Sequence, residues 1–192
     1  FLFLIISLIL WFYSSRFKKY FIWGNLCVAF LAGLIPLTVI TFEIPLLSDV
    51  YSDVVVKNHV GFASVFYWTL CFSYLLFFNM LIYEINKDIY SVNGDRAEGI
   101  TTIPVKWGIS ATRTLLTGLT ILVISSLIAF FLWKFSESVL AGIYMVIFLI
   151  LPYIGYALVI RREGCMKVQL RLIRTLMVLC MLLSLFVHTT LK

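Results

Sequence analysis

Long apolar runs, separated by short polar clusters at regular intervals, constrain this chain more than any other feature. Residues 1–13 form the end of one run, and further runs lie at about 20–42, 60–83, 111–133, 138–160 and 168–189. A helix needs about twenty apolar residues to cross the hydrocarbon of a bilayer. The runs contain glycine and serine and lack the strict alternation of barrel strands. The pattern predicts an all-α fold, a polytopic transmembrane helix bundle of about six spans.

The composition excludes an ordinary soluble domain. Apolar residues make up 62% of the chain and charged residues only 12%, whereas about a quarter of the residues of a soluble domain are charged. We expect one integral membrane domain over residues 1–192. Because the chain begins with Phe1 rather than Met and enters an apolar run at once, we expect it to be a piece of a longer protein or a processed product.

Basic residues are concentrated on one side of the predicted bundle. If the six spans alternate in direction, the clusters at 14–19, 84–113 and 161–174 share a side and hold twelve of the fifteen Lys and Arg residues. The positive-inside rule assigns that side to the cytoplasm. We therefore expect a protein of the plasma (inner) membrane, surrounded by membrane lipids, with these loops in the cytoplasm. No basic face interleaved with aromatic residues indicates nucleic-acid binding.

One strongly polar stretch, EINKDIYSVNGDRAEGITTIP at residues 84–104, follows the third run. Glu84 and Asp88 are four residues apart and share a helical face. Asn93-Gly94 is a turn signal, so we expect the helix to end there and the chain to bring Asp95 back towards Asp88. Carboxylates gathered in this way, with Lys and Arg nearby, suit Mg²⁺ bridging to a phosphate or diphosphate.

A plain solvated loop is the competing interpretation of the same stretch, since structural charge clusters are common. Two details favour a site. Four of the six charged residues are acidic, which membrane orientation does not require, and the glycines are spaced as if the backbone folds back over a ligand.

The stretch, written E-I-x-K-D-I-x-x-x-x-G-D-R-x-x-G-x-T-T-I-P, resembles the second aspartate-rich motif of the UbiA-type intramembrane prenyltransferases. The resemblance is strongest to the digeranylgeranylglyceryl phosphate synthase-like branch. The segment YSSRFKKYFIWGNLCVAFLAG is similar to the family's Y-S-x-x-L-K followed by G-N at the head of the next span. The resemblance implies the last six helices of a nine-helix fold. The family's first aspartate-rich motif does not occur in this sequence.

The resemblance also implies roles for individual residues. Asp88 and Asp95 would be Mg²⁺ and diphosphate ligands, and Lys87 would act with them in catalysis. The implied substrate-binding residues are Arg96, Glu84, Lys18, Asn79 and Ser91. Asn79 would face the cavity, and Lys18 matches a basic residue after the family's fourth helix. Ser91 stands where the family usually has Asp, and Tyr83 where Arg often precedes the Glu.

The implied activity is Mg²⁺-dependent transfer of a polyprenyl group from a prenyl diphosphate to a lipid-like or aromatic acceptor, for example geranylgeranylglyceryl phosphate. The aromatic residues Phe72, Tyr74, Phe77 and Phe78 precede the motif and could shelter the prenyl tail, although packing is the preferred interpretation of any single ring. Two alternatives stay open: a non-catalytic membrane remnant or subunit of such an enzyme, and a small-molecule transporter. Transporters usually place ionisable groups inside their spans, which makes the second alternative the weaker one.

Overall fold

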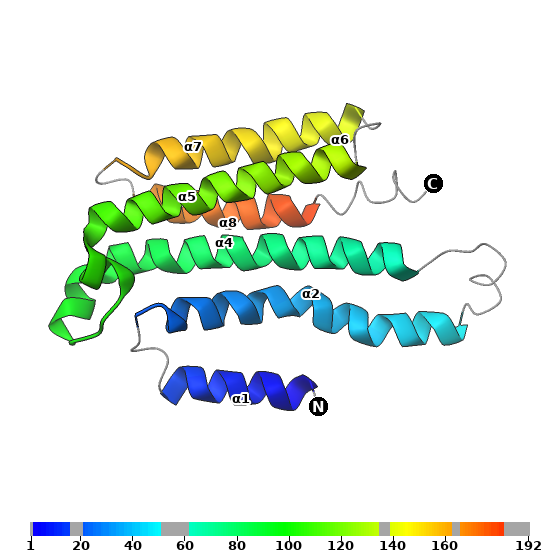
Figure 1. The fold of residues 1–192 in the computed structure, drawn as a ribbon, viewed down its shortest axis with the longest axis horizontal. Helices are drawn as coiled ribbons and strands as arrows, with labels where there is room; N and C mark the ends of the chain where they lie inside the picture. The colour runs from blue at the N-terminus through cyan, green and yellow to red at the C-terminus, as the bar shows by residue number, and fades with distance from the viewer. Residues whose placement is uncertain (1, 16–20, 51–61, 135–138, 163–165, 183–192) are drawn as a thin grey trace.

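The computed structural model describes residues 2–15, 21–50, 62–134, 139–162 and 166–182, and every regular element in these ranges is a helix. The elements are α1 (Leu2–Ser15), α2 (Trp23–Val50), α4 (Phe62–Ala97), α5 (Ile103–Lys134), α6 (Val139–Tyr144), the π-helix η2 (Met145–Ile150), α7 (Leu151–Val159) and α8 (Met166–Leu182). Figure 1 shows them side by side with their axes nearly aligned. The predicted all-α bundle is confirmed.

Four helices in the described ranges are long and apolar enough to cross a membrane. They cover Trp23–Leu46, Val65–Ala97, Ile103–Trp133 and Gly142–Val159. The described part of α1 has 14 residues and that of α8 has 17, somewhat fewer than the roughly twenty that a span needs. The last predicted span, 168–189, runs past the described residues. The chain is therefore a polytopic integral membrane protein.

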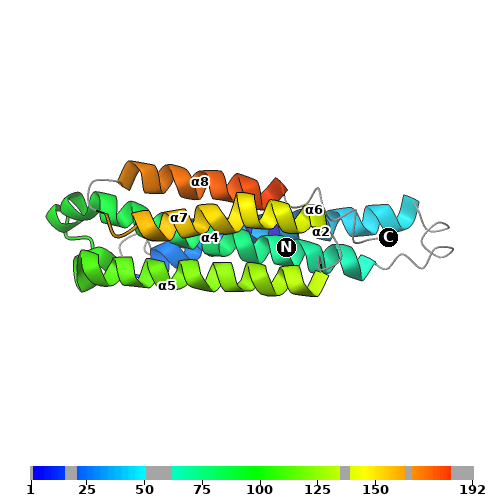
Figure 2. The ribbon, with the colours of Figure 1, turned by 90° about the horizontal axis from the view of Figure 1, so that it is seen from above.

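Helix α4 occupies the centre of the arrangement. It packs against α5 and α8, which both contact α7, so that α4, α5, α7 and α8 form a four-helix bundle. The two views agree, because α5 and α8 lie on opposite sides of α7 in Figure 2. On its other flank α4 packs along α2, and α1 lies beyond α2 (Figure 1). Helix α4 consequently has neighbouring helices on several of its sides.

Large apolar side chains fill the bundle at the three- and four-residue spacing of one helical face. The fully buried members are Ile82, Ile103, Leu116, Leu127, Met145, Leu149, Tyr153, Tyr156, Ile160, Ile173 and Leu176. The two tyrosines place hydroxyl groups inside this apolar core. Burial of that kind fixes which face of each helix turns outward.

The helical geometry is locally irregular at two places, in α5 and just before α7. Gly108 has φ +83° and ψ 160°, a conformation that glycine adopts without steric conflict, and it separates a first turn, Ile103–Trp107, from the long part of α5. The π-helix η2 directly precedes α7, whose second residue is Pro152. Proline supplies no backbone N–H to the preceding turn, and wider π-helical turns are one way in which a helix adapts locally.

The prediction that Asn93-Gly94 ends the helix is wrong, because α4 continues through both residues to Ala97. The chain turns away from the helix at Gly99, two residues after the end of α4, where φ is +69°. The Ile100 N–H donates to the Asp95 carbonyl at 2.8 Å and the Gly99 N–H donates to the Arg96 carbonyl at 3.3 Å, the hydrogen-bond pattern of a Schellman motif. One glycine inside a helix costs only about 1 kcal/mol, which a helix packed this closely tolerates.

Candidate functional site

Four polar residues form a single stripe along α4: Glu84, Asp88, Ser91 and Asp95, called the acidic stripe below. Their spacing of four, three and four residues puts them on one helical face. Because the helix does not end at Gly94, Asp95 does not fold back towards Asp88. It lies seven residues, about 10 Å, further along the axis at 1.5 Å per residue.

Asp88 joins α4 to α2. Its carboxylate accepts a hydrogen bond of 2.7 Å from the Asn25 amide, in the first turn of α2, and the carboxylate is mostly buried. Asn25 was not among the site residues predicted from the sequence. The sequence feature that could have indicated Asn25 is the G-N pair at the head of that span, which is part of the resemblance. The contact orients the Asp88 carboxylate relative to α2.

Asp95 has two hydroxyl donors. Ser91 donates to its carboxylate at 2.9 Å from one turn earlier, and Thr102 donates to the same oxygen at 3.4 Å from beyond the end of α4. Ser91, which stands where the resemblance implies an Asp, therefore holds the Asp95 carboxylate. The Schellman motif at Gly99 returns Thr102 to this position.

Basic side chains flank the stripe. Lys87 makes an ion pair with Glu84, and Arg96 is exposed in the last turn of α4. Lys106 lies over the ring of Phe21, with its Nζ 4.6 Å from the centroid, and Trp107 meets the same ring edge-on. The segment after α4 is thereby packed against the residues that lead into α2. Lys18 lies outside the described residues.

Asn79 is fully buried, and its side chain contacts residues of α7 and α8. The Tyr153 hydroxyl donates to Asn79 Oδ1 at 2.6 Å, and the Asn79 amide donates to the Leu75 carbonyl at 2.9 Å and lies 3.7 Å from Cys180 Sγ. The expectation that Asn79 faces a substrate cavity is at odds with these contacts. Its position indicates a structural role inside the bundle.

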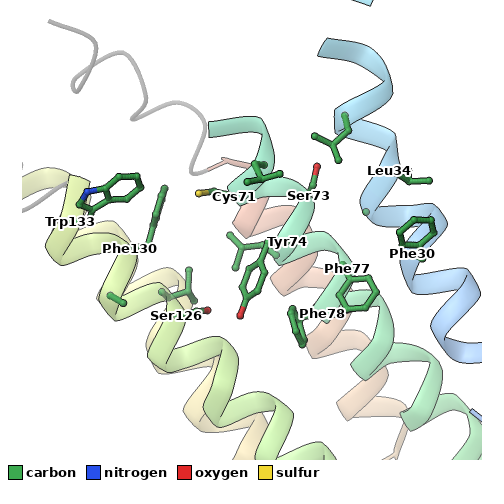
Figure 3. Close-up of a pocket in the computed structure, with 16 residues that line it drawn as sticks. Phe30, Leu34, Cys71, Ser73, Tyr74, Phe77, Phe78, Ser126, Phe130 and Trp133 are labelled. Atoms are coloured by element: carbon green, nitrogen blue, oxygen red, sulfur yellow. The ribbon is translucent and has the colours of Figure 1, made fainter. Parts of the chain in front are cut away.

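A large apolar cavity of about 830 Å³ lies between α2, α4 and α5. Figure 3 shows Phe30 of α2, Tyr74 and Phe77 of α4, and Phe130 and Trp133 of α5 around it. Three of the four aromatic residues noted before the motif, Tyr74, Phe77 and Phe78, line this cavity. Phe77 is seven residues before Glu84, so the cavity and the acidic stripe share one face of α4.

The described residues do not by themselves assemble a metal centre. No group of three or more His, Cys, Asp or Glu side chains in the described ranges could hold a metal ion. Asp88 and Asp95 offer the carboxylate oxygens that Mg²⁺ prefers, but two helical turns separate them. The two carboxylates are therefore better placed to bind two separate cations than to coordinate a single one together.

The fold and this face of α4 define a polytopic membrane bundle with carboxylates next to an apolar cavity. Residues 1–179 match the profile of the UbiA prenyltransferase family. The chain belongs to that family.

Two relatives are both named digeranylgeranylglyceryl phosphate synthase. The protein of Thermococcus sibiricus is 31% identical over 105 residues, which cover 55% of this chain and 30% of the relative. The protein of Methanothermobacter thermautotrophicus is 29% identical over 109 residues, which cover 57% of this chain and 32% of the relative. The matched segment thus spans about a third of each relative's length. No solved structure matches the chain.

Proposed function

We propose that the protein transfers a polyprenyl group from a prenyl diphosphate to a lipid-like acceptor. The observation that carries the proposal is the shared face of α4, on which the acidic stripe follows directly after the residues that line the 830 Å³ cavity. A prenyl diphosphate has the same division, a strongly anionic head on a hydrocarbon tail. Pockets of roughly 300–1,000 Å³ accommodate ligands of this size.

In this proposal Asp88 and Asp95 hold Mg²⁺, each through its own carboxylate. When bound, Mg²⁺ neutralises the diphosphate and so assists its departure as a leaving group. The residues of this chain keep the two carboxylates in place, Asn25 for Asp88 and Ser91 for Asp95. Lys87 and Arg96 add positive charge near the phosphate oxygens, where preorganised cations stabilise developing negative charge.

The acceptor is the finer part of the proposal. The name of both relatives describes a glyceryl phosphate that carries two geranylgeranyl groups as product, so we propose geranylgeranylglyceryl phosphate or a similar lipid before an aromatic acceptor. We also propose that the acidic stripe faces the cytoplasm, because most basic residues lie at that end of the bundle.

A non-catalytic membrane subunit is the second candidate. It is favoured by Ser91 in place of the usual Asp and by the absence, within the described ranges, of three ligands that could close around a metal ion. In that case the carboxylates would bind a prenyl diphosphate without turning it over.

The test is transfer of labelled geranylgeranyl groups by the purified complete protein, with Mg²⁺ and with EDTA, to geranylgeranylglyceryl phosphate and to an aromatic acceptor. We expect transfer to the lipid with Mg²⁺ and none with EDTA. The matched inactive control is the double variant Asp88→Asn/Asp95→Asn. Binding of the donor without transfer to either acceptor would favour the non-catalytic subunit.

A further inference from the structure

Three basic residues of α8 share one exposed side of the helix and are called the basic face below: Lys167, Arg171 and Arg174. Their spacing of four and three residues aligns them, whereas Ile173 and Leu176 on the other side of α8 are fully buried. Figure 2 shows α8 at the edge of the bundle. The positive-inside rule accounts for basic residues at this end of the protein, but not for their alignment on a single face.

The packing of α8 fixes the direction of the basic face. Gln169 is buried and donates to the Val159 carbonyl at 2.8 Å, and the Tyr144 hydroxyl donates to the Leu179 carbonyl at 2.7 Å. The two contacts lie near the two ends of α8 and keep it from rotating about its axis. The basic face is therefore held on the outside of the bundle.

Arg174 is anchored at the level where the apolar part of α4 ends. It donates a hydrogen bond of 2.6 Å to the Tyr83 hydroxyl, and its guanidinium carbon lies 5.2 Å from the centroid of the same ring. Tyr83 is the last residue of the apolar run 60–83, and the polar stretch 84–104 follows it. Lipid headgroups lie directly outside the hydrocarbon of a bilayer. The guanidinium is therefore fixed at the depth of the headgroups.

The charge of the basic face is not compensated within the described part of the chain. None of its three side chains makes an ion pair with a carboxylate there, and Glu84, the acid next to Tyr83, pairs with Lys87. Glu163 lies outside the described residues. A guanidinium has five N–H donors and binds a phosphate with two parallel hydrogen bonds. Arg174 can therefore bind a phosphate group without releasing Tyr83.

Apolar side chains continue the same side of α8 deeper into the membrane. Val178 and Met181 follow Arg174 at the same four- and three-residue spacing, and both are exposed. In a bilayer they contact lipid hydrocarbon. One exposed side of α8 thus presents cations at the level of the headgroups and apolar side chains below them. A phospholipid has the same division between its phosphate headgroup and its acyl chains.

We propose that the basic face binds the phosphate headgroup of an anionic phospholipid of the surrounding bilayer. Arg174, held by Tyr83, is the fixed contact, and Arg171 and Lys167 add positive charge one and two turns further out. Basic clusters at the ends of membrane helices attract anionic lipids in this way. The site uses no residue of the acidic stripe or of the cavity, so it does not depend on the proposed function.

The test measures lipid retention by the complete purified protein. Native mass spectrometry in detergent counts bound phosphatidylglycerol and phosphatidylcholine as each lipid is titrated. We expect the wild type to retain phosphatidylglycerol preferentially, and its melting temperature to rise with that lipid, because a ligand of the folded state stabilises it. We expect Arg174→Ala to weaken phosphatidylglycerol binding by about fivefold or more, the effect of removing one basic residue near an anionic surface.

Three further variants separate binding from folding. Lys167→Ala and Arg171→Ala each leave the contact between Arg174 and Tyr83 in place, and each should also weaken phosphatidylglycerol binding. Arg162→Ala is the matched control, because Arg162 is an exposed arginine at the same end of the protein but lies beyond the end of α7, and it should change binding by less than about twofold. An equal loss in Arg162→Ala and Arg171→Ala would overturn the site in favour of diffuse attraction to the whole basic end.

A soluble phosphate offers the same chemistry as the headgroup, so a second arm adds excess glycerol phosphate at constant ionic strength. A site for a bilayer lipid predicts that the retained phosphatidylglycerol stays unchanged. Displacement of the lipid by glycerol phosphate would overturn the proposal in favour of a soluble phosphate ligand. Equal retention of phosphatidylglycerol and phosphatidylcholine by the wild type would overturn it outright.

Discussion

Two sides of α4 carry polar residues that differ in their hydrogen-bond partners. On the side towards α7 and α8, Asn79 is fully buried and bonded to Tyr153. On the side of the acidic stripe, Asp88 and Asp95 each accept hydrogen bonds from neutral donors, an amide and hydroxyl groups. Each carboxylate oxygen has more than one lone pair, so both groups can accept further bonds. The first side stabilises the bundle, and the second carries the carboxylates of the proposed site.

Substitution of the carboxylates should have the largest effect and would break the comparison if it did not. In the complete protein, Asp88→Asn and Asp95→Asn should each lower Mg²⁺-dependent transfer by roughly 100-fold or more, because electrostatic stabilisation of the leaving group is lost. Steady-state transfer assays measure this. Glu98→Gln is the matched control, since Glu98 is an exposed acid just past the end of α4, and it should retain near-normal turnover. Normal turnover by both Asp variants would rule out the site.

Gly33 tests how the binding side of α4 is held against α2. A Cβ at Gly33 would lie 3.1 Å from Phe77 Cβ and 3.2 Å from the Ser73 carbonyl oxygen. Gly33→Ala should therefore separate the two helices and lower stability by about 1–3 kcal/mol, as other overpacked contacts do, with a lower melting temperature in detergent. Gly118→Ala is the control, because a Cβ there meets nothing within 4 Å. Equal melting temperatures for the two variants would contradict the close contact.

Tyr153 and Tyr156 sharpen the comparison on the structural side. Both are fully buried in α7, but the Tyr153 hydroxyl is bonded to Asn79 whereas the Tyr156 hydroxyl has no partner in the described residues. Tyr153→Phe should destabilise the protein by about 0.6–1.7 kcal/mol, the range for hydrogen bonds between membrane helices. Tyr156→Phe should be neutral or stabilising. Thermal unfolding of the two variants measures the difference, and turnover per folded molecule should be unchanged in both.

The smallest expected effect concerns Asn25. Asn25→Ala removes the donor to Asp88 and leaves the carboxylate in place, so transfer should fall only a few-fold, in line with the roughly 1 kcal/mol of a typical hydrogen bond. The apparent Mg²⁺ affinity, measured by titrating the metal in the transfer assay, should weaken with it. A loss as large as that of Asp88→Asn would mean that Asn25 itself contacts substrate.

Much of the site was accessible from the sequence because its residues are close along the chain. The four-residue spacing of Glu84 and Asp88 placed these two on one helical face, whereas Asp95 was expected to fold back and joins that face only because α4 continues to Ala97. The error at Asn93-Gly94 arose from the same local reasoning. A turn signal is a local preference, and a packed helix with a stronger stop at Gly99 overrides it. The contacts of Asn79 with Tyr153 and Cys180 could not be predicted, because helical spacing alone does not say which face meets which neighbour.

By itself the sequence determined that this is a polytopic all-α membrane protein, where its polar motif lies and which family it resembles, because hydropathy and motif spacing are local properties of the chain. Tertiary structure alone decided three hydrogen bonds: Asn25 to Asp88, Tyr153 to Asn79, and Arg174 to Tyr83. These pairs are 63, 74 and 91 residues apart. Contacts at such separations depend on how whole helices pack, which no local pattern specifies.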